Sequence, residues 1–321
     1  MRKLLLSLLA LSGAYAMGAR AADAPAGTVI VNTAQVHYVV AATPFTQSAT
    51  ANITVAQLVN VTVTWQNGSD VSVTAGSTQQ TLLFKVTNTG NGPDIFKLAD
   101  TLVTPGGTTF TPASCLVYFD TANTGLFAPS DVLYTPGSND PHLAQNQSQN
   151  MLVVCNVPNS AVDTALGEMQ LGATSKTASG TFGSVSAGAG VGGVDAIVGA
   201  STGVSDATGI YQVHQFAVAY VQSAASVSAP GGGHKVVDGA TVEYTLTVTP
   251  SGSASGNNMV LTDPIPANTT YVPGSLLLNG TAVTPANGDY NLTTPGAVTV
   301  KLGTLAGSAS PQVVKFQVTI N

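Results

Sequence analysis

The chain has 321 residues, with 9 Lys and Arg against 15 Asp and Glu, so only 7% of its residues are charged. Helical surfaces are usually built from Glu, Lys and Arg, and this composition therefore argues against a helix-rich fold. The cations are too few to neutralise a phosphate backbone, so nucleic acid is not expected as a partner. The 44% hydrophobic content is too high for a disordered chain, so we expect a folded β protein.

The N-terminus has the pattern of a signal peptide. Two basic residues precede a short apolar run at 4–11, and small residues suited to cleavage follow. We predict a signal peptide over 1–21 with cleavage after Ala21, and Ala16 or Ala22 as alternative sites. The apolar run is too short to span a bilayer, so the mature chain is expected to be secreted without a membrane span.

Period-two alternation of β-branched and aromatic residues, interrupted by Gly, Asn, Pro and Ser clusters, predicts short strands throughout the chain. In chain order the predicted strands are 28–39, 49–55, 59–65, 71–74, 81–87, 95–98, 116–119, 151–157, 168–174, 211–221, 241–248, 258–262, 275–278, 297–302 and 313–320. This spacing is typical of antiparallel sandwiches.

The same sequence patterns divide the chain into domains. We predict an all-β protein with an N-terminal hairpin over 22–57, a first sandwich domain over 58–222 and a second sandwich domain over 235–321. The segment APGGG at 229–233, which ends in a glycine run, marks a predicted hinge over 223–234. The Gly-, Ala- and Ser-rich stretch 179–208 is expected to be a long loop with one strand at 196–198.

Two cysteines, Cys115 and Cys155, fit an oxidising compartment. They are expected to form one disulfide that joins two strands of the first domain, and two free buried thiols are the alternative.

The segments of the second domain carry a family resemblance. They read GATVEYTLTV at 239–248, NMVLTDPIP at 258–266, TYVPGSL at 270–276, LGTL at 302–305 and VKFQVTI at 314–320. In order and spacing they resemble the conserved-repeat domain of bacterial surface proteins, domain-of-unknown-function family eleven. The segment FKVTNTGNG at 84–92 resembles it more loosely. The resemblance implies Ig-like β-sandwich repeats used as spacers or stalks.

Two segments that resemble this family's closing hairpin lie at an unusual position in the chain. In tandem members, a strand like 316–320 is followed by a hairpin that completes the same sandwich. Here the matching segments, AGTVIVNTAQVHY at 26–38 and TANITV at 50–55, open the mature chain instead. The second domain is therefore expected to be incomplete and the hairpin to complete another copy, as in donor-strand complementation.

This hypothesis assigns interface residues by strand alternation. The donor hairpin should bury Ile30, Ala34, Val36, Tyr38, Ala51, Ile53 and Val55, and the receiving edge should include Val314, Phe316, Val318 and Ile320. The expected partner is a second copy, bound head to tail in a homopolymer. Closure within one chain and completion by another envelope or fibre protein are the alternatives.

No pattern points to catalysis. The four histidines, at 37, 142, 214 and 234, are scattered, and neither a nucleophile elbow nor a phosphate loop occurs, so no enzyme activity, cofactor or catalytic residue is predicted. The segment 120–131 weakly resembles a calcium loop through Asp120, Asn123 and Asp131, but it lacks acidic residues at most ligand positions, so a plain β-turn is the favoured interpretation.

Together these features predict a secreted structural subunit of an extracellular filament or surface fibre. A monomeric surface binding module, such as an adhesin or stalk fragment, is the competing hypothesis.

Overall fold

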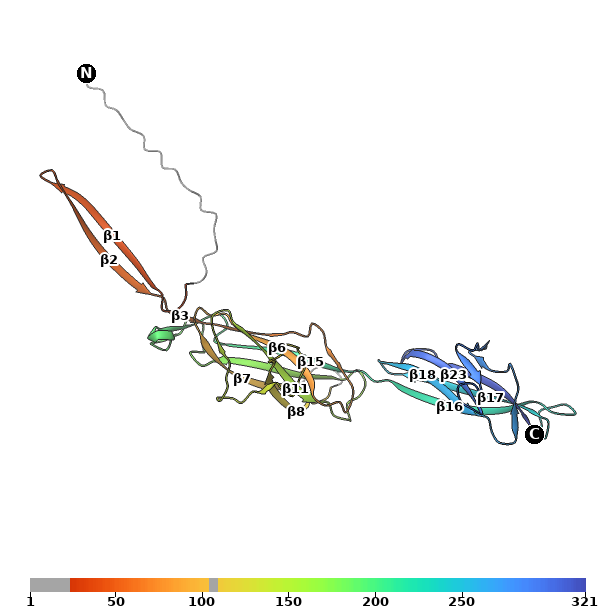
Figure 1. Cartoon of the computed structure of the whole chain (residues 1–321). Helices are drawn as coiled ribbons and strands as arrows, with labels where there is room; N and C mark the ends of the chain where they lie inside the picture. The colour runs from red at the N-terminus through yellow and green to blue at the C-terminus, as the bar shows by residue number, and fades with distance from the viewer. Residues whose placement is uncertain (1–23, 104–108) are drawn as a thin grey trace, which may run out of the picture.

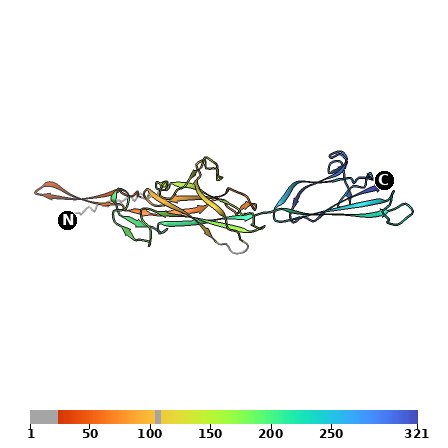
Figure 2. The same cartoon turned by 90° about the horizontal axis from the view of Figure 1, so that it is seen from below.

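The computed structural model describes residues 24–103 and 109–321, so the predicted signal peptide lies outside the described residues. Within them the fold is all-β with no α-helix, and the predicted fold class of antiparallel Ig-like sandwiches is confirmed. A projecting hairpin, a middle sandwich and a C-terminal sandwich follow one another along the molecule (Figures 1 and 2). No helix in this part of the chain is long and apolar enough to cross a membrane.

The hairpin consists of β1 (Val29–Val40) and β2 (Thr43–Thr54), which pair with each other over their whole length. They form a two-stranded sheet of their own. Ala41 and Ala42 make the turn, both at positive φ, which is the geometry of a two-residue hairpin turn that matches the strand twist.

The middle sandwich packs two five-stranded sheets. One has the order β10 (His142–Leu143), β7 (Asp94–Val103), β12 (Leu166–Ser175), β15 (Val204–Val213) and β5 (Val71–Val73). The other has the order β4 (Val61–Trp65), β6 (Gln80–Asn88), β11 (Ser148–Asn156), β8 (Ala113–Phe119) and β9 (Val132–Leu133). Their inward residues, among them the fully buried Phe84, Phe96 and Tyr211, form one core.

A small sheet caps the hairpin end of this sandwich. Its order is β13 (Val185–Ser186), β14 (Ala196–Val198) and β3 (Gln57–Val59), with a 3-10 turn at Val191–Gly193. The predicted strand at 196–198 is confirmed. The predicted loop ends earlier than expected, because β15 already begins at Val204 and pairs with β12 from there.

The C-terminal sandwich is smaller and less symmetric. One sheet has the order β16 (Ala217–Ser228), β17 (Thr241–Ser251), β24 (Gln312–Ile320), β20 (Leu277–Leu278) and β21 (Thr281–Ala282), with β19 (Thr269–Tyr271) also paired to β24. The facing sheet has the order β18 (Ser255–Pro264), β23 (Ala297–Ala306) and β22 (Gly288–Tyr290). A second core lies between them, centred on Leu246, Val300 and Phe316.

Two predicted boundaries need correction. Strand β16 pairs with β17 along almost its whole length, so residues from 217 belong to the C-terminal sandwich and the junction lies at 214–216, before the predicted 223–234. The glycine run is the turn between β16 and β17, where Gly231, Gly232 and Gly233 all take positive φ. Composition could not distinguish the two, because a hinge and a wide hairpin turn both favour glycine.

Candidate assembly interface

The hairpin has one apolar face. Cross-strand partners in an antiparallel pair point to the same side, and here Ile30 lies opposite Ile53, Ala34 opposite Ala49, and Tyr38 opposite Phe45. By this register Ile30, Ala34, Val36, Tyr38, Ala51 and Ile53, six of the seven predicted donor residues, share one face. The seventh, Val55, is half-buried at the hairpin base.

Phe45 belongs to the same face but was not predicted. Its ring stacks on that of Tyr38, with the centroids 5.4 Å apart. The alternation reaches Phe45 in the sequence, but Pro44 beside it is a residue that strands avoid, and the predicted strand therefore began only at 49.

The opposite face of the hairpin is mostly polar. The hydroxyls of Thr33 and Thr50 are 3.0 Å apart, and His37 Nδ1 lies 2.9 Å from Thr46 Oγ1. No Asp, Glu, Lys or Arg occurs between residues 24 and 69. The hairpin can therefore be buried against another surface without removing an ionised side chain from water.

Every residue of both strands is exposed, including the apolar ones. Val36 is 63% exposed and Ile53 66% exposed, although alternation assigns both to a face that should be buried. A two-stranded hairpin is only marginally stable alone in water. Large exposed apolar patches are typical of interaction surfaces, so this face is a candidate for one.

The base of the hairpin is fixed to the middle sandwich by two side chains. Asn91 accepts a hydrogen bond from Leu58 N at 2.6 Å and donates to Ala56 O at 3.0 Å. The buried Gln57 donates to Pro93 O at 2.9 Å and accepts from Val191 N at 2.7 Å. The hairpin therefore leaves the sandwich in a defined direction.

The predicted receiving edge is not an edge. Strand β24, which carries Val314, Phe316, Val318 and Ile320, is hydrogen-bonded to β17 on one side and to β19 and β20 on the other. Val314, Phe316 and Val318 are fully buried in the intrachain core. The prediction was wrong because alternation shows which residues face inward but does not show which neighbours pair with the strand.

The open side of the C-terminal sandwich lies elsewhere, between β16 and β18. Each is the outermost strand of its sheet, and a groove of about 310 Å³ runs between them. We call this groove the open seam. It is lined by Val218, Tyr220, Val248, Met259, Val260, Leu261, Thr262 and Leu302.

The inward residues of β16 are not covered. Val218 and Tyr220 lie opposite Pro250 and Val248 on β17, so they face the interior of the sandwich, yet they are 42% and 51% exposed. Strand alternation in the sequence cannot reveal the exposure of these residues or the presence of the seam. Both features depend on how far the smaller sheet extends over the larger one.

One polar contact crosses the seam. Gln222 on β16 donates to Asp263 Oδ2 on β18 at 3.0 Å. Burial raises the pKa of Asp263, and the hydrogen bond from Gln222 offsets part of this rise. Burial and the nearby charge of Asp263 also raise the pKa of Tyr220. Asp263 is thus a carboxylate placed in largely apolar surroundings.

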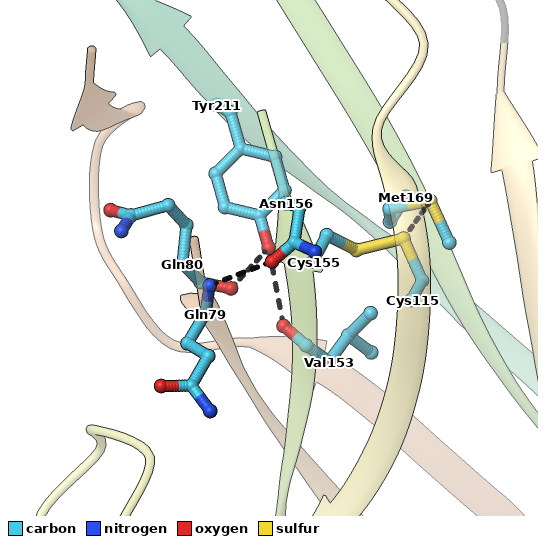
Figure 3. The surroundings of a disulfide bond; sticks show 8 residues. All are labelled: Gln79, Gln80, Cys115, Val153, Cys155, Asn156, Met169 and Tyr211. Carbon is cyan, nitrogen blue, oxygen red and sulfur yellow. Dashed lines mark hydrogen bonds between the residues drawn. A yellow bond between two sulfur atoms is a disulfide. The ribbon is translucent and has the colours of Figure 1, made fainter. Parts of the chain in front are cut away.

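The predicted disulfide is confirmed. Cys115 on β8 and Cys155 on β11 are bonded, and β8 and β11 are neighbours in one sheet of the middle sandwich. Figure 3 shows the bond beside Met169 and near Tyr211. The Tyr211 hydroxyl lies 2.9 Å from Gln80 O and 3.2 Å from Val153 O. Burial raises the pKa of Tyr211. The disulfide therefore lies in the packed core of the middle sandwich.

The acidic loop at 120–131 uses its carboxylates internally. Asp120 accepts hydrogen bonds from Thr124 N and Gly125 N, and Asp131 accepts from Thr121 N and Ala128 N, all at 2.8 to 3.1 Å. Burial alone would raise the pKa of Asp131, but the hydrogen bonds that it accepts have the larger combined effect, so its pKa is lowered. In the described residues, no group of three or more His, Cys, Asp or Glu side chains is placed to hold a metal ion.

No protein-family model matches the sequence, and no curated protein matches it. The resemblance to the conserved-repeat family is therefore not confirmed.

Several solved structures align with this chain at low similarity. The C-terminal domain of the Streptococcus agalactiae antigen I/II polypeptide BspA aligns over 81% of this chain and 91% of its own, at 8% identity and a TM-score of 0.35. That of the Streptococcus pyogenes antigen I/II-family protein AspA aligns over 82% and 91%, at 10% identity and a TM-score of 0.34. A putative membrane anchored protein from Corynebacterium diphtheriae aligns over 91% and 89%, at 12% identity and a TM-score of 0.23. TM-scores this low do not establish a common fold.

Proposed function

We propose that this chain is an exported structural subunit that assembles head to tail. The β1–β2 hairpin of one copy covers the C-terminal sandwich of the next copy on its open side. One observation carries the proposal: a fully exposed, uncharged hairpin with an apolar face at one end of a chain whose other end carries an apolar open seam.

Closure within one chain is disfavoured by the position of the two surfaces. Asn91 and Gln57 fix the hairpin base at one end of the middle sandwich, and the C-terminal sandwich continues from the opposite end (Figure 1). The second junction is also braced, because Ser253 Oγ donates to Asp163 at 2.6 Å and Gln215 N donates to the same carboxylate at 2.8 Å. Folding back would require both junctions to be broken.

Burial of the apolar face provides the driving force. Covering five large side chains, Ile30, Val36, Tyr38, Phe45 and Ile53, contributes roughly 1.5–3 kcal/mol each, and association and ordering offset part of this sum. The remaining free energy supports a stable joint. Because the two contacting surfaces differ, each added subunit presents a new free hairpin, and the assembly grows as an open filament.

Export is supported by the basic and apolar pattern at the N-terminus and by the disulfide, which persists in oxidising compartments. We therefore place the filament outside the cell.

The test compares two neighbouring substitutions on opposite hairpin faces. Val36→Asp places a charge on the apolar face, and Gln35→Asp places the same charge on the polar face. Both positions are exposed in the single subunit, so neither change should unfold it. We expect wild type and Gln35→Asp to form filaments in negative-stain microscopy. Val36→Asp should stay monomeric or lose about 100-fold in assembly affinity, since burying an unpaired charge costs roughly 3 kcal/mol.

Wild-type chains that remain monomeric at high concentration, or Val36→Asp chains that assemble normally, would overturn the proposal. A monomer that binds a host or envelope surface would then favour the alternative function of a binding module.

A further inference from the structure

We infer that the hairpin docks by strand addition: β1 of one copy pairs antiparallel with the free edge of β18 in the next copy, in the register that sets Asn32 opposite Asp263. This inference rests on the proposed head-to-tail assembly and specifies its receiving strand. The open seam has two free edges, β16 and β18, and the structure distinguishes between them.

Pairing with β18 would cover the exposed lining of the seam. The sheet that contains β18 has three strands, and it leaves the inward residues Val218 and Tyr220 of the facing sheet exposed. Strands added to β18 would lie over these residues, with the apolar hairpin face against them. Strands added to β16 would extend the larger sheet instead, and would leave both the seam and the apolar hairpin face uncovered.

The chain direction of β18 also suits an incoming β1. Strand β18 starts at the junction with the middle sandwich, where Ala254 N donates to Gln215 O, and it runs toward the far end, where Asn321 N donates to Asn268 O. A hairpin that enters from the far end points its tip toward that junction. Strand β1 runs from base to tip and is therefore antiparallel to β18, which is the favoured arrangement for a hairpin and its neighbour.

The polar positions of β1 and β18 match. On the apolar side of β1 the one polar residue is Asn32, and the inward residues at 259, 261 and 263 of β18 include one polar residue, Asp263. Setting these two opposite each other places Ala34 opposite Leu261 and Val36 opposite Met259. The Asn32 amide can then donate to the carboxylate, which already accepts from Gln222 through one of its two oxygens.

Strand β18 has a bulge between Gly256 and Met259, so in this register its regular part, 259–264, would pair with 31–36 of β1. The stacked Tyr38 and Phe45 rings would then lie beyond the bulge, toward the first residues of β18. Phe216 packs against Gly256 there, where even an added Cβ atom would clash with its ring.

Cysteine pairs test the receiving strand. In this register Thr33 and Thr262 are directly opposite on the outer face, so a chain carrying Thr33→Cys and Thr262→Cys should form a covalent ladder on a non-reducing denaturing gel. The matched control pairs Thr33→Cys with Val221→Cys, which lies on the outward side of β16. We expect a ladder from the first chain and none from the control.

The outcomes separate this inference from the proposed function. Filaments that cross-link only through Val221, or through neither position, overturn the pairing with β18 and leave head-to-tail assembly intact. Chains that form no filaments, or that cross-link only within themselves, overturn the assembly.

A second measurement tests the register. Asn32→Asp should weaken assembly severalfold by placing two carboxylates opposite each other. Adding Asp263→Asn to the same chain should restore assembly, because an amide and a carboxylate then again face each other, with their positions exchanged. No rescue would exclude this register.

Discussion

The two sandwiches differ most at the place where one sheet ends beside the other. In the middle sandwich β4 is the outermost strand of its sheet and lies beside β15. Its exposed edge is closed by two hydroxyls: Val61 N donates to Ser201 Oγ at 3.1 Å, and Val63 N donates to Ser205 Oγ at 3.0 Å. Side chains from β15 and from the turn before it therefore satisfy the edge amides, and Val61 and Val63 are buried.

The corresponding seam of the C-terminal sandwich has a single side-chain bridge, from Gln222 to Asp263, and its apolar lining is partly exposed. An edge closed by side chains cannot easily accept another strand, whereas an open edge beside an exposed apolar lining can. The same architecture thus has a closed edge in one sandwich and an open edge in the other.

The largest expected effect concerns the middle sandwich. Replacing Cys115 and Cys155 by Ala opens a loop with a sequence separation of 40 residues, which should lower the unfolding free energy of the middle sandwich by roughly 3–4 kcal/mol. The one tryptophan, Trp65, packs against the core of this sandwich, so its fluorescence in urea reports the middle sandwich alone. Calorimetry should show no matching change in the C-terminal sandwich. An equal shift in both domains would show that they unfold as one unit.

The next effect concerns the open seam. Val218→Asp puts a charge on the exposed lining and should reduce assembly by about 100-fold, or roughly 3 kcal/mol, because docking would bury it. Ala219→Asp carries the same charge one residue further along β16, on the outward side, and is the control. Sedimentation of both variants measures assembly. Equal loss in the two would mean that net charge, and not the seam, controls association.

A smaller effect is expected on opening the closed seam. Ser201→Ala together with Ser205→Ala leaves the amides of Val61 and Val63 without acceptors and should cost the middle sandwich about 1 kcal/mol for each bond. Hydrogen exchange at these two amides should accelerate. Unchanged exchange would show that the serine hydroxyls do not hold this edge closed.

Much of this contrast could not be predicted from the sequence. Alternation in 28–39 located the hairpin and its apolar face, because the side-chain period of a strand is local information. The disulfide was accessible for a similar reason, since two cysteines allow one pairing. The receiving surface was not, because the neighbours of β24 come from segments distant in sequence. Ser201 and Ser205 also gave no signal, as both lie in a stretch where serine is common.

The smallest effect is a pH dependence that has opposite signs at two aspartates. The pKa of Asp263 is raised, so the folded state binds its proton more tightly than the unfolded state does. Its contribution to the C-terminal sandwich is therefore favourable below the unfolded value of 3.8 and is lost as the pH rises through the folded pKa. Asp263→Asn keeps an acceptor for Gln222 and removes the charge, so it should stabilise this sandwich at neutral pH and make its unfolding less dependent on pH.

Asp163 is the matched case of opposite sign. Hydrogen bonds from Ser253 and Gln215 lower its pKa, so its contribution is present above the unfolded value of 3.8 and is lost as the pH falls through the folded pKa. Asp163→Asn should therefore destabilise the junction at neutral pH and have little effect in acid. Calorimetry of both variants between about pH 3 and pH 7 measures the two slopes. If Asp263→Asn also destabilises the domain at neutral pH, the charged Asp263 carboxylate stabilises the C-terminal sandwich, and its burial at the seam does not destabilise it.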